Sequence, residues 1–275
     1  MNSLVSVIMP CYKVSPLYLK KSVESILSQS YDNLELIVVI DPSVPELDKE
    51  TMYILESYKD DKRLKIILHK KREGLVNSLN EAVIFSKGEY IARADGDDIN
   101  TRFRIERQIS FMLNNGYFMV GSWGLLIDEN DKVIYRIKKP VTPGEIRRKI
   151  MLHNPFLHST VFIKKKVLEN VGLYDNRFEY SEDYELWLRI ISKGYPCANL
   201  PRYLVMIRET KTSITRGSKW LKNRCAYFKC KMYAHKKYAF NTLLDNIYLA
   251  MTPIALMAHP KMDFAVKKFL GFLGG

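Results

Sequence analysis

The sequence predicts an α/β protein with a mostly parallel sheet that is flanked by helices. Short runs rich in Val, Ile and Leu alternate with longer runs in which apolar residues recur at helical spacing. The short runs have the composition of strands that are buried on both faces. Because a helix between consecutive strands forms a crossover connection, this alternation places the strands parallel to one another.

The amino-terminal part of the chain shows the alternation most clearly. Pro10 is expected to close the first strand, Asp41-Pro42 the second, and Gly88 to halt the third helix. Strands are expected at residues 4–9, 34–40, 64–68 and 89–94, and helices at residues 16–29, 46–58 and 75–85. This order and spacing are typical of βαβ units.

Beyond residue 98 the alternation becomes irregular. Ser181 is the expected N-cap of a late helix, and Gly194 stands just beyond its end. The expected elements are helices at residues 100–114, 143–152, 165–171 and 182–192, and strands at residues 117–127, 132–137, 160–163 and 203–207. We expect them to complete one domain that spans residues 1–215.

The composition is that of a folded soluble protein, with 47% hydrophobic and 27% charged residues. The four cysteines lack the spacing of a zinc site, so we expect reduced thiols in a cytoplasmic protein. We recognise no signal peptide, and no apolar run reaches the roughly 18 residues of a membrane-spanning helix.

Positive charge is concentrated toward the carboxyl end. Residues 202–275 hold 14 of the 43 Lys and Arg residues but only three of the 30 acidic residues. Basic and aromatic residues are interleaved over residues 216–240. This mixture suits a helix at an anionic membrane surface, and a helical appendage packed on the main domain is the alternative. We expect residues 216–275 to form a basic amphipathic helical tail with peripheral attachment to the inner face of the cytoplasmic membrane.

The most unusual stretch is Asp95-Gly96-Asp97-Asp98, directly after the strand at residues 89–94. Gly96 allows a sharp turn that aims the flanking carboxylates at one point. Carboxylates this close repel one another unless a cation lies among them, and oxygen ligands suit Mg²⁺ or Mn²⁺. For these residues alone an acidic surface turn is the simpler interpretation. A calcium loop is excluded, because Asn100 stands where that loop needs Gly.

Three other residues are expected at the same edge of the sheet. Asp41, after the second strand, can accept hydrogen bonds from a base or a ribose, or it can serve as a turn residue. Pro10 and Tyr12 mark the end of the first strand. Tyr12 can stack on a base, or it can pack as a buried aromatic residue.

Four candidates lie later in the chain. Glu182 and Asp183 occupy the first turn of a helix, where the helix dipole is expected to keep them ionised at neutral pH. An ionised carboxylate there can act as a general base on a sugar hydroxyl, or it can simply stabilise the helix. For His158 a catalytic or metal-binding role and a structural role are both open. Arg208 can bind a phosphate or form a surface ion pair.

Together these motifs resemble the family 2 inverting glycosyltransferases of the GT-A fold, particularly bacterial enzymes that build capsule, lipopolysaccharide or exopolysaccharide. The resemblance covers about residues 3–215, and the matching pieces occur in the order of the family. They are residues 5–12, 25–31, 35–43, 74–75 with 79–80, 88–98, 158–160 and 181–189. The chain departs from the family pattern at Ile40, where an acid is usual, at Pro42, where Gly is usual, and at Arg72, where Asn is common.

The resemblance implies metal-dependent transfer of a sugar, with inversion, from a nucleoside diphosphate sugar to a hydroxyl of a glycan or lipid-linked saccharide, and a UDP-sugar is the expected donor. It implies Asp183 as the catalytic base. We expect Asp95, Asp97 and His158 to hold Mn²⁺ or Mg²⁺. The residues expected to bind the nucleotide sugar are Pro10, Tyr12, Asp41, Arg72, Asp95, Gly96, Glu182 and Arg208.

Three other classes of protein stay open at this point. A sugar-nucleotide nucleotidyltransferase shares the sheet and the metal, but it usually has a glycine-rich loop where this chain has residues 10–13. A nucleic-acid-binding protein would explain the positive charge but not the acidic turn, so we expect no nucleic acid partner. A catalytically inactive glycosyltransferase-like binding module would share every motif.

Overall fold

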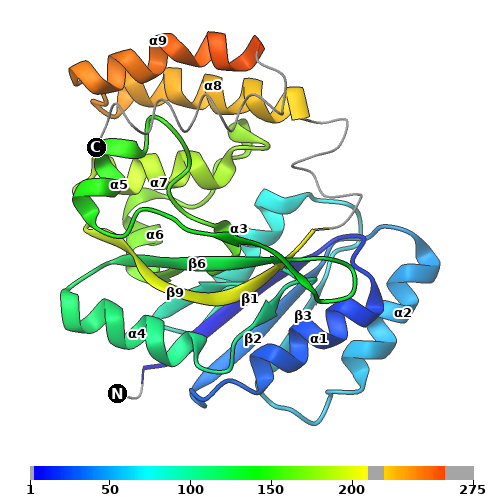
Figure 1. The fold of residues 1–275 in the computed structure, drawn as a ribbon. Helices are drawn as coiled ribbons and strands as arrows, with labels where there is room; N and C mark the ends of the chain where they lie inside the picture. Colours follow the sequence, from blue (N-terminus) through cyan, green and yellow to red (C-terminus); the bar gives the residue numbers. More distant parts are fainter. Residues whose placement is uncertain (1–2, 210–219, 258–275) are drawn as a thin grey trace.

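Figure 1 shows the fold in a computed structural model that describes residues 3–209 and 220–257. The strands are β1 (Val5–Cys11), β2 (Leu34–Ile40), β3 (Leu64–Leu68), β4 (Tyr90–Arg93), β5 (Ile99–Asn100), β6 (Met119–Ile127), β7 (Val133–Ile137), β8 (Phe162–Lys164) and β9 (Cys197–Arg208). The α-helices are α1 (Pro16–Leu27), α2 (Pro45–Glu56), α3 (Leu75–Phe85), α4 (Arg104–Asn115), α5 (Pro143–Lys149), α6 (Lys165–Val171), α7 (Glu182–Ser192), α8 (Trp220–Lys237) and α9 (Leu243–Met257). Two short 3-10 helices are η1 (His158–Thr160) and η2 (Asn176–Phe178).

The sheet has a parallel half and a mixed half. Its strand order is β3-β2-β1-β4-β8-β6-β9-β5, and β7 pairs with β6 beside this path. The strands β3, β2, β1 and β4 are parallel throughout, and β6 and β9 are parallel to each other. The strands β8, β5 and β7 join antiparallel to their neighbours. The carboxyl ends of the four parallel strands therefore meet at one edge of the sheet.

Alternate residues of the central strands feed two hydrophobic cores, as the two-residue period of a strand requires. In β1, Val7 packs in the core that contains residues of α1 and α4, whereas Ile8 packs in the core that contains residues of α3 and α7. In β2, Val38 and Val39 divide in the same way. Burial on both faces explains why these strands are apolar apart from Ser6 and Glu35, whose side chains pair through a 2.6 Å hydrogen bond.

Most sequence-based expectations for the elements are confirmed. The bounds of β2, β3, α3, α6 and α7 agree residue for residue with those expected. Pro10, however, does not close the first strand, because β1 continues to Cys11. The neighbouring strand β4 pairs with β1 only as far as Ile8, so the N–H that Pro10 lacks is not needed there.

Two strands of the mixed half differ from expectation. The sequence does not predict β5, whose Ile99 and Asn100 pair with β9 and delay the start of α4 to Arg104. The strand β9 begins at Cys197 rather than at residue 203. Its polar and proline residues interrupt the apolar pattern, and a register shift at Ser122 and Trp123 of β6 accommodates the interruption.

The helices α8 and α9 lie against the main domain (Figure 1). Cys230, Ala234, Phe240 and Tyr248 are buried in the core that also contains residues of α7. The described part of the predicted tail is thus a packed appendage, whereas the expected boundary at residues 215–216 lies outside the described residues. None of the helices in the described ranges is long and apolar enough to cross a membrane.

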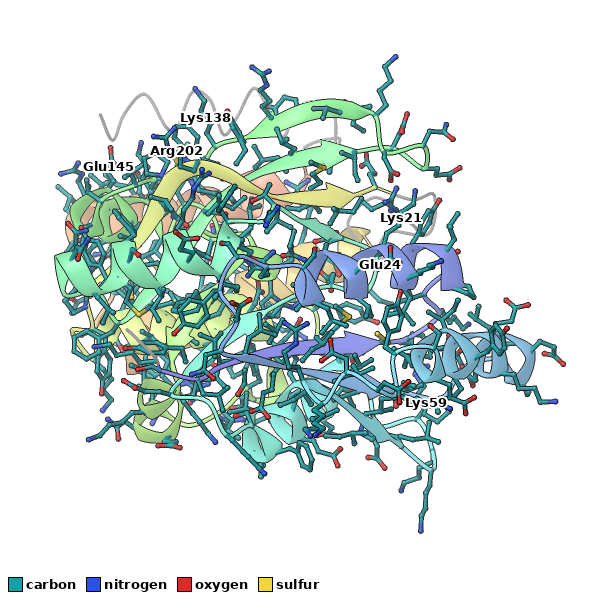
Figure 2. All side chains as sticks on the ribbon, turned by 90° about the horizontal axis from the view of Figure 1, so that it is seen from below. Lys21, Glu24, Lys59, Lys138, Glu145 and Arg202 are labelled. Atoms are coloured by element: carbon teal, nitrogen blue, oxygen red, sulfur yellow. The ribbon has the colours of Figure 1, made fainter. Side chains whose placement is uncertain are left out.

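Charged side chains lie mainly at the surface, as do Lys21 and Glu24 on α1, which Figure 2 labels. Three of the exceptions lie in β4 or shortly after it. Arg93, Asp98 and Arg104 are 5%, 1% and 0% exposed, respectively. Ionised groups are rarely buried without a partner or a function, so these buried charges indicate a functional site in this part of the sheet.

Candidate active site

The expected residues of the acidic turn and of the first two strands meet at the carboxyl edge of the parallel half. Cys11, which ends β1, is in register with Ile40, which ends β2. The backbone N–H of Ala94, just beyond β4, donates a 3.0 Å hydrogen bond to the Ile8 carbonyl of β1. Asp41, Tyr12 and Asp95 therefore follow three adjacent strand ends, as the sequence predicts.

The acidic turn is held in place by bonds to distant elements. Ser22 Oγ of α1 donates a 2.7 Å hydrogen bond to the carbonyl of Asp95, and the Arg208 N–H of β9 donates a 2.9 Å bond to Asp98 Oδ1. Gly96 lies so close to β1 that an added Cβ would come within 2.9 Å of Cys11 Sγ. A glycine is therefore required at this position by close packing.

The carboxylates of this turn are crowded together, and the nearby positive charges only partly neutralise them. Burial, together with the negative charge of Asp95, raises the pKa of Asp97 to about 6. Burial and the charges of Asp95 and Asp97 raise the pKa of Asp98 well above its usual value. Arg93 and Arg208 oppose the rise at Asp97 but do not cancel it. This oxygen-rich, under-neutralised group fits a divalent cation such as Mg²⁺ or Mn²⁺.

Arg93 lies at the centre of the electrostatics and was not among the residues singled out from the sequence. Its buried guanidinium forms an ion pair with Asp95, whose side chain is partly exposed. Its positive charge lowers the pKa of Asp97 on one side and the pKa of Glu182 and Asp183 on the other. The signal in the sequence that could have identified Arg93 is its charge at the end of the otherwise apolar strand β4.

Asp183 lies in the first turn of α7, with both carboxylate oxygens bound. Asn154 Nδ2 donates a 2.7 Å bond to Oδ2, and the Tyr184 N–H donates a 2.6 Å bond to Oδ1. Burial raises the pKa of Asp183, while these bonds and the charges of Arg93 and Lys139 oppose the rise. Burial thus favours the protonated carboxyl group, whereas the hydrogen bonds and positive charges favour the ionised carboxylate. Such opposing influences on the pKa are typical of a catalytic base.

The expectation that the helix dipole keeps both acids ionised is wrong for Glu182. Burial and the negative charge of Asp183 raise the pKa of Glu182 to about 7, so near neutral pH it is only partly ionised. Glu182 is 9% exposed, and this loss of hydration outweighs the dipole, which contributes only about 1 kcal/mol.

His158 lies in η1 beside the same buried region. Its Nε2 is 2.9 Å from the Tyr174 hydroxyl, and its ring lies edge-on to Trp187 at 5.9 Å. Burial and the charge of Arg93 lower its pKa, so the imidazole is neutral. In residues 3–209 and 220–257 no three side chains of His, Cys, Asp or Glu are arranged to hold a metal ion. His158 as a ligand beside Asp95 and Asp97 therefore stays a prediction.

Asp41 is engaged with the loop that follows β3. Its carboxylate accepts bonds from the N–H groups of Glu73 and Gly74 at 2.7 and 2.9 Å and lies 3.1 Å from His69 Nδ1. These contacts fix the loop that carries Arg72, whose guanidinium lies 4.5 Å from the centre of the Tyr12 ring. Tyr12 and Arg72 are thus brought together as expected, while a contact between Asp41 and a base stays a prediction.

Arg208 is neither at the surface nor in an open cleft. Its side chain is 0% exposed, stacks on Tyr18 at 4.1 Å and bonds to Asp131. Its Nε also donates a 3.0 Å bond to the Asp97 carbonyl. In this arrangement Arg208 supports the acidic turn, and its expected contact with a phosphate stays a prediction.

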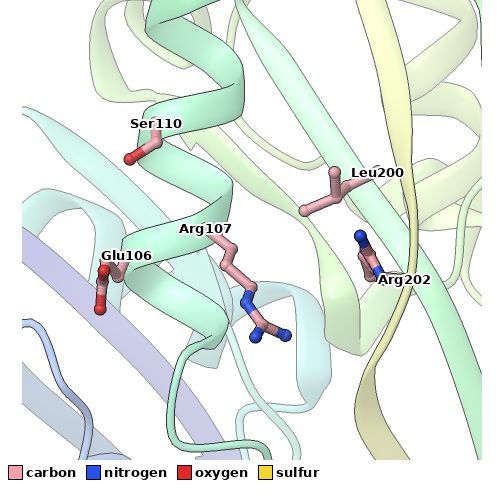
Figure 3. Close-up of a pocket in the computed structure, with 5 residues that line it drawn as sticks. All are labelled: Glu106, Arg107, Ser110, Leu200 and Arg202. Atoms are coloured by element: carbon pink, nitrogen blue, oxygen red, sulfur yellow. The ribbon is translucent and has the colours of Figure 1, made fainter.

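A hollow of about 340 Å³ lies between α4 and β9 and not at the acidic turn (Figure 3). Glu106 at its margin accepts a 2.5 Å bond from Ser30, in the loop that enters β2. This loop precedes β2, so the hollow lies toward the edge of the sheet opposite to Asp41. Its residues are Glu106, Arg107, Ser110, Leu200 and Arg202, and none of them is a candidate of the site.

Known proteins share this fold. The chain matches the mannosyltransferase PcManGT from Pyrobaculum calidifontis, in complex with GDP-Man and Mn²⁺, with a TM-score of 0.65 and 17% identity over 99% of this chain and 81% of that one. It matches residues 1–349 of TarS from S. aureus, in complex with UDP-GlcNAc, with a TM-score of 0.66 and 16% identity over 94% and 77%. The fold is therefore the expected GT-A fold.

Similar sequences include glycosyltransferases that are named for O-antigen and amylovoran biosynthesis. The O-antigen biosynthesis glycosyltransferase WbnJ of Escherichia coli is 32% identical over 88% of this chain and 92% of its own length. The amylovoran biosynthesis glycosyltransferase AmsE of Erwinia amylovora is 30% identical over 96% and 98%. The UDP-Gal:alpha-D-GlcNAc-diphosphoundecaprenol beta-1,3-galactosyltransferase of Escherichia coli is 29% identical over 92% and 94%.

The family model for glycosyl transferase family 2 matches residues 6–172, which include all of β1 except Val5, together with β2 and the acidic turn. This match assigns the chain to the glycosyltransferases rather than to the nucleotidyltransferases or the nucleic-acid-binding proteins. The chain belongs to glycosyl transferase family 2 and is a glycosyltransferase of the kind that acts in bacterial polysaccharide synthesis.

Proposed function

We propose that the protein transfers a sugar from a nucleoside diphosphate sugar, with a UDP-sugar as the first candidate, to a hydroxyl of a glycan or lipid-linked saccharide, with inversion at the anomeric carbon. The observation that carries this proposal is the position of Arg93. Its positive charge acts on Asp97 after β4 and on Asp183 at the start of α7. The buried Arg93 guanidinium is therefore near both the carboxylate expected to bind the donor and the carboxylate expected to activate the acceptor. A transferase that brings two substrates together needs both sides in one site.

On the donor side, Asp95 and Asp97 would hold Mn²⁺ or Mg²⁺, with His158 as the further candidate ligand. The crowded carboxylates and the raised pKa of Asp97 support this assignment. A bound cation would neutralise the charge that develops on the diphosphate leaving group. Tyr12, just beyond β1, and Arg72, on the loop after β3, stack on each other and would contact the nucleotide.

On the acceptor side, Asp183 would accept the proton of the attacking hydroxyl. The hydroxyl oxygen then bonds to the anomeric carbon as the bond from that carbon to the diphosphate oxygen breaks. One displacement of this kind inverts the anomeric configuration and needs no nucleophile from the protein. The hydrogen bonds from Asn154 and Tyr184 would keep the carboxylate oriented toward the acceptor.

Acceptors linked to lipid would reach the site from a membrane surface. On α9, Leu243 and Ile247 are 78% and 42% exposed, and Ala250 lies exposed one turn further along the same face. Lys236 and Lys237 are exposed at the adjoining end of α8. An apolar stripe beside basic residues suits peripheral contact with an anionic membrane. This contact would keep the protein at the inner face of the cytoplasmic membrane.

A panel of nucleotide sugars tests the proposal. Each donor is incubated with an undecaprenyl-diphosphate saccharide acceptor, with Mn²⁺, with Mg²⁺ and with a chelator, and the anomeric configuration of the product is read by NMR. We expect turnover with at least one UDP-sugar, loss of turnover with chelator and in Asp97→Ala, and an inverted product. A retained configuration, or undiminished turnover in chelator, would contradict the proposal.

A further inference from the structure

We infer that Asn154 is a positioning residue for Asp183 and that Tyr227 ties this pair to helix α8. The inference rests on the proposed role of Asp183 as the base. Asn154 Nδ2 is 2.7 Å from Asp183 Oδ2 and 3.4 Å from the Tyr227 hydroxyl oxygen. One amide group therefore bridges the first turn of α7 and a helix of the carboxyl-terminal appendage.

The orientation of the Asn154 amide is fixed by its surroundings. Its Oδ1 accepts a 3.1 Å hydrogen bond from the backbone N–H of Phe156. Because a backbone N–H can only donate, the oxygen must face Phe156 and the amide nitrogen must face Asp183. The Asn154 backbone is held as well, since Lys139 Nζ donates a 2.7 Å bond to its carbonyl oxygen. The side chain is thus a rigid donor to the carboxylate.

Asp183 is held at both of its oxygens. Oδ2 accepts from Asn154, and Oδ1 accepts from the N–H of Tyr184 at the helix start. A carboxylate has about four acceptor positions, so two of them stay available for an acceptor hydroxyl. Two anchors on different elements define the plane of the group, and such fixed orientation contributes to rate through correct approach geometry.

Helix α8 supports this arrangement at two points. The Tyr227 ring stacks on the Tyr184 ring, with centres 5.0 Å apart and an angle of 18°. One turn further along α8, Lys231 Nζ donates a 3.1 Å bond to the carbonyl of Leu152, two residues before Asn154. The appendage therefore braces the segment that carries Asn154, and it contributes to the active site in addition to covering the core.

Several charged or titratable groups surround Asp183, and they determine its response to pH. They are Glu182 on the same helix, Arg93 of β4, Lys139 after β7, Tyr174 after α6, and Tyr227 and Cys230 of α8. In addition to these groups, the hydrogen bond from Asn154 lowers the pKa of Asp183. Removing this bond leaves burial less opposed, so the carboxyl group would ionise at a higher pH.

The test is Asn154→Leu, which keeps the branched shape of the side chain and removes the amide. We expect kcat for transfer to fall about 10- to 100-fold, with the KM of the nucleotide sugar unchanged and the acidic limb of the pH–rate profile moved to higher pH. Tyr227→Phe keeps the stacked ring and should lower kcat only a few-fold. The matched controls are Asn170→Leu and Tyr195→Phe, which break another Asn–Tyr bond, of 3.1 Å, at the surface.

Asp183→Asn, measured alongside, distinguishes a failure of the positioning role of Asn154 from a failure of the proposed function. If Asp183→Asn abolishes transfer while Asn154→Leu keeps the wild-type kcat and pH profile, the positioning role is wrong and the proposed base stands. If Asp183→Asn transfers at the wild-type rate, the proposed function itself fails. Should Asn154→Leu not fold, Asn154→Ser replaces it with the same expectations, because a serine hydroxyl is too short to reach both partners.

Discussion

Arg93, at the end of β4, lies close enough to Asp183, at the start of α7, for its charge to lower the pKa of that carboxyl group. The same guanidinium forms the ion pair with Asp95. Residues that lie 90 positions apart in the sequence are therefore coupled through one cation. The coupling joins the part of the chain matched by the family model to α7, which lies beyond the matched residues.

Replacing Arg93 tests this coupling. In Arg93→Met the carboxyl groups of Asp97, Glu182 and Asp183 lose a neighbouring positive charge, so the pKa of each rises further. We expect the acidic limb of the pH–rate profile to move to higher pH and kcat at pH 7 to fall at least about 10-fold. Arg93→Lys keeps the charge and should retain more activity. Equal profiles for both variants and the wild type would show that Arg93 has no such influence.

The Asp97 carboxyl group should lower stability when no metal is bound. Its pKa is raised to about 6, so it favours folding while protonated, and this contribution is lost as the pH rises from about 4 to about 6. We expect Asp97→Asn, in chelator at pH 7.5, to unfold at a temperature a few degrees higher than wild type, corresponding to about 1–3 kcal/mol. The difference should shrink toward pH 5.

Added Mn²⁺ should reverse this order of stability. The wild type gains stability by binding the ion, whereas Asp97→Asn loses a ligand and gains little. Asp60→Asn, at an exposed position, is the control for removing a surface charge. A wild type that is more stable than Asp97→Asn in chelator at pH 7.5 would contradict the assignment of Asp97 as a crowded, under-neutralised carboxylate.

The loop that carries Arg72 should respond to the titration of His69. Burial lowers the pKa of His69, but hydrogen bonds to Asp41 and Glu81 outweigh burial, and the pKa is raised above its usual value. Charged His69 thus stabilises the fold at low pH, and the contribution is lost as the pH rises through the raised pKa. His69→Gln should therefore cost more stability at pH 6 than at pH 9.

Thermal unfolding of His69→Gln at the two pH values measures this effect. His235→Gln, which removes a half-buried histidine bonded to Asn246 at 2.7 Å, is the control. An NMR titration of the His69 ring gives the pKa directly. A value below 6.5 would show that burial prevails over the two carboxylates.

The exposed stripe of α9 should govern binding to membranes. Serine at both Leu243 and Ile247 removes apolar surface that is already exposed, so the fold should be little affected. We expect the double variant to lose most of its pelleting with vesicles that contain anionic lipid, as should a chain truncated after residue 216. Ile84→Ser, at a residue of α3 that is 70% exposed, is the control. Equal pelleting of all forms would reject the membrane contact.

The sequence predicts the parallel half of the fold and the position of the acidic turn well. The strand β2 is buried on both faces, so all of its residues except Glu35 are apolar, and its bounds can be read directly. Asp41 and Asp95 follow strand ends, and parallel strands bring such residues to one edge. These features depend on local pattern and on the rule for crossover connections, both of which a sequence displays.

The rest depends on contacts between distant segments. Asn154 is an ordinary loop residue until its partner Asp183 is placed. Arg93 is an ordinary strand residue until the fold brings Glu182 and Asp183 within reach of its charge. The raised pKa of Glu182 follows from burial, which the position of a residue in a helix does not reveal. The strand β9 is hidden by polar and proline residues that a register shift accommodates.

The most direct measurement compares donor binding and sugar transfer in Asp183→Asn. Calorimetry gives the Kd of the nucleotide sugar with Mn²⁺, and product formation with a lipid-linked acceptor gives kcat in the same preparation. We expect Asp183→Asn to bind the donor with the wild-type Kd and to transfer the sugar about 10²- to 10⁴-fold more slowly, because only the base is lost. Transfer at the wild-type rate would contradict the account, since acids on both sides of Arg93 would then not serve one reaction.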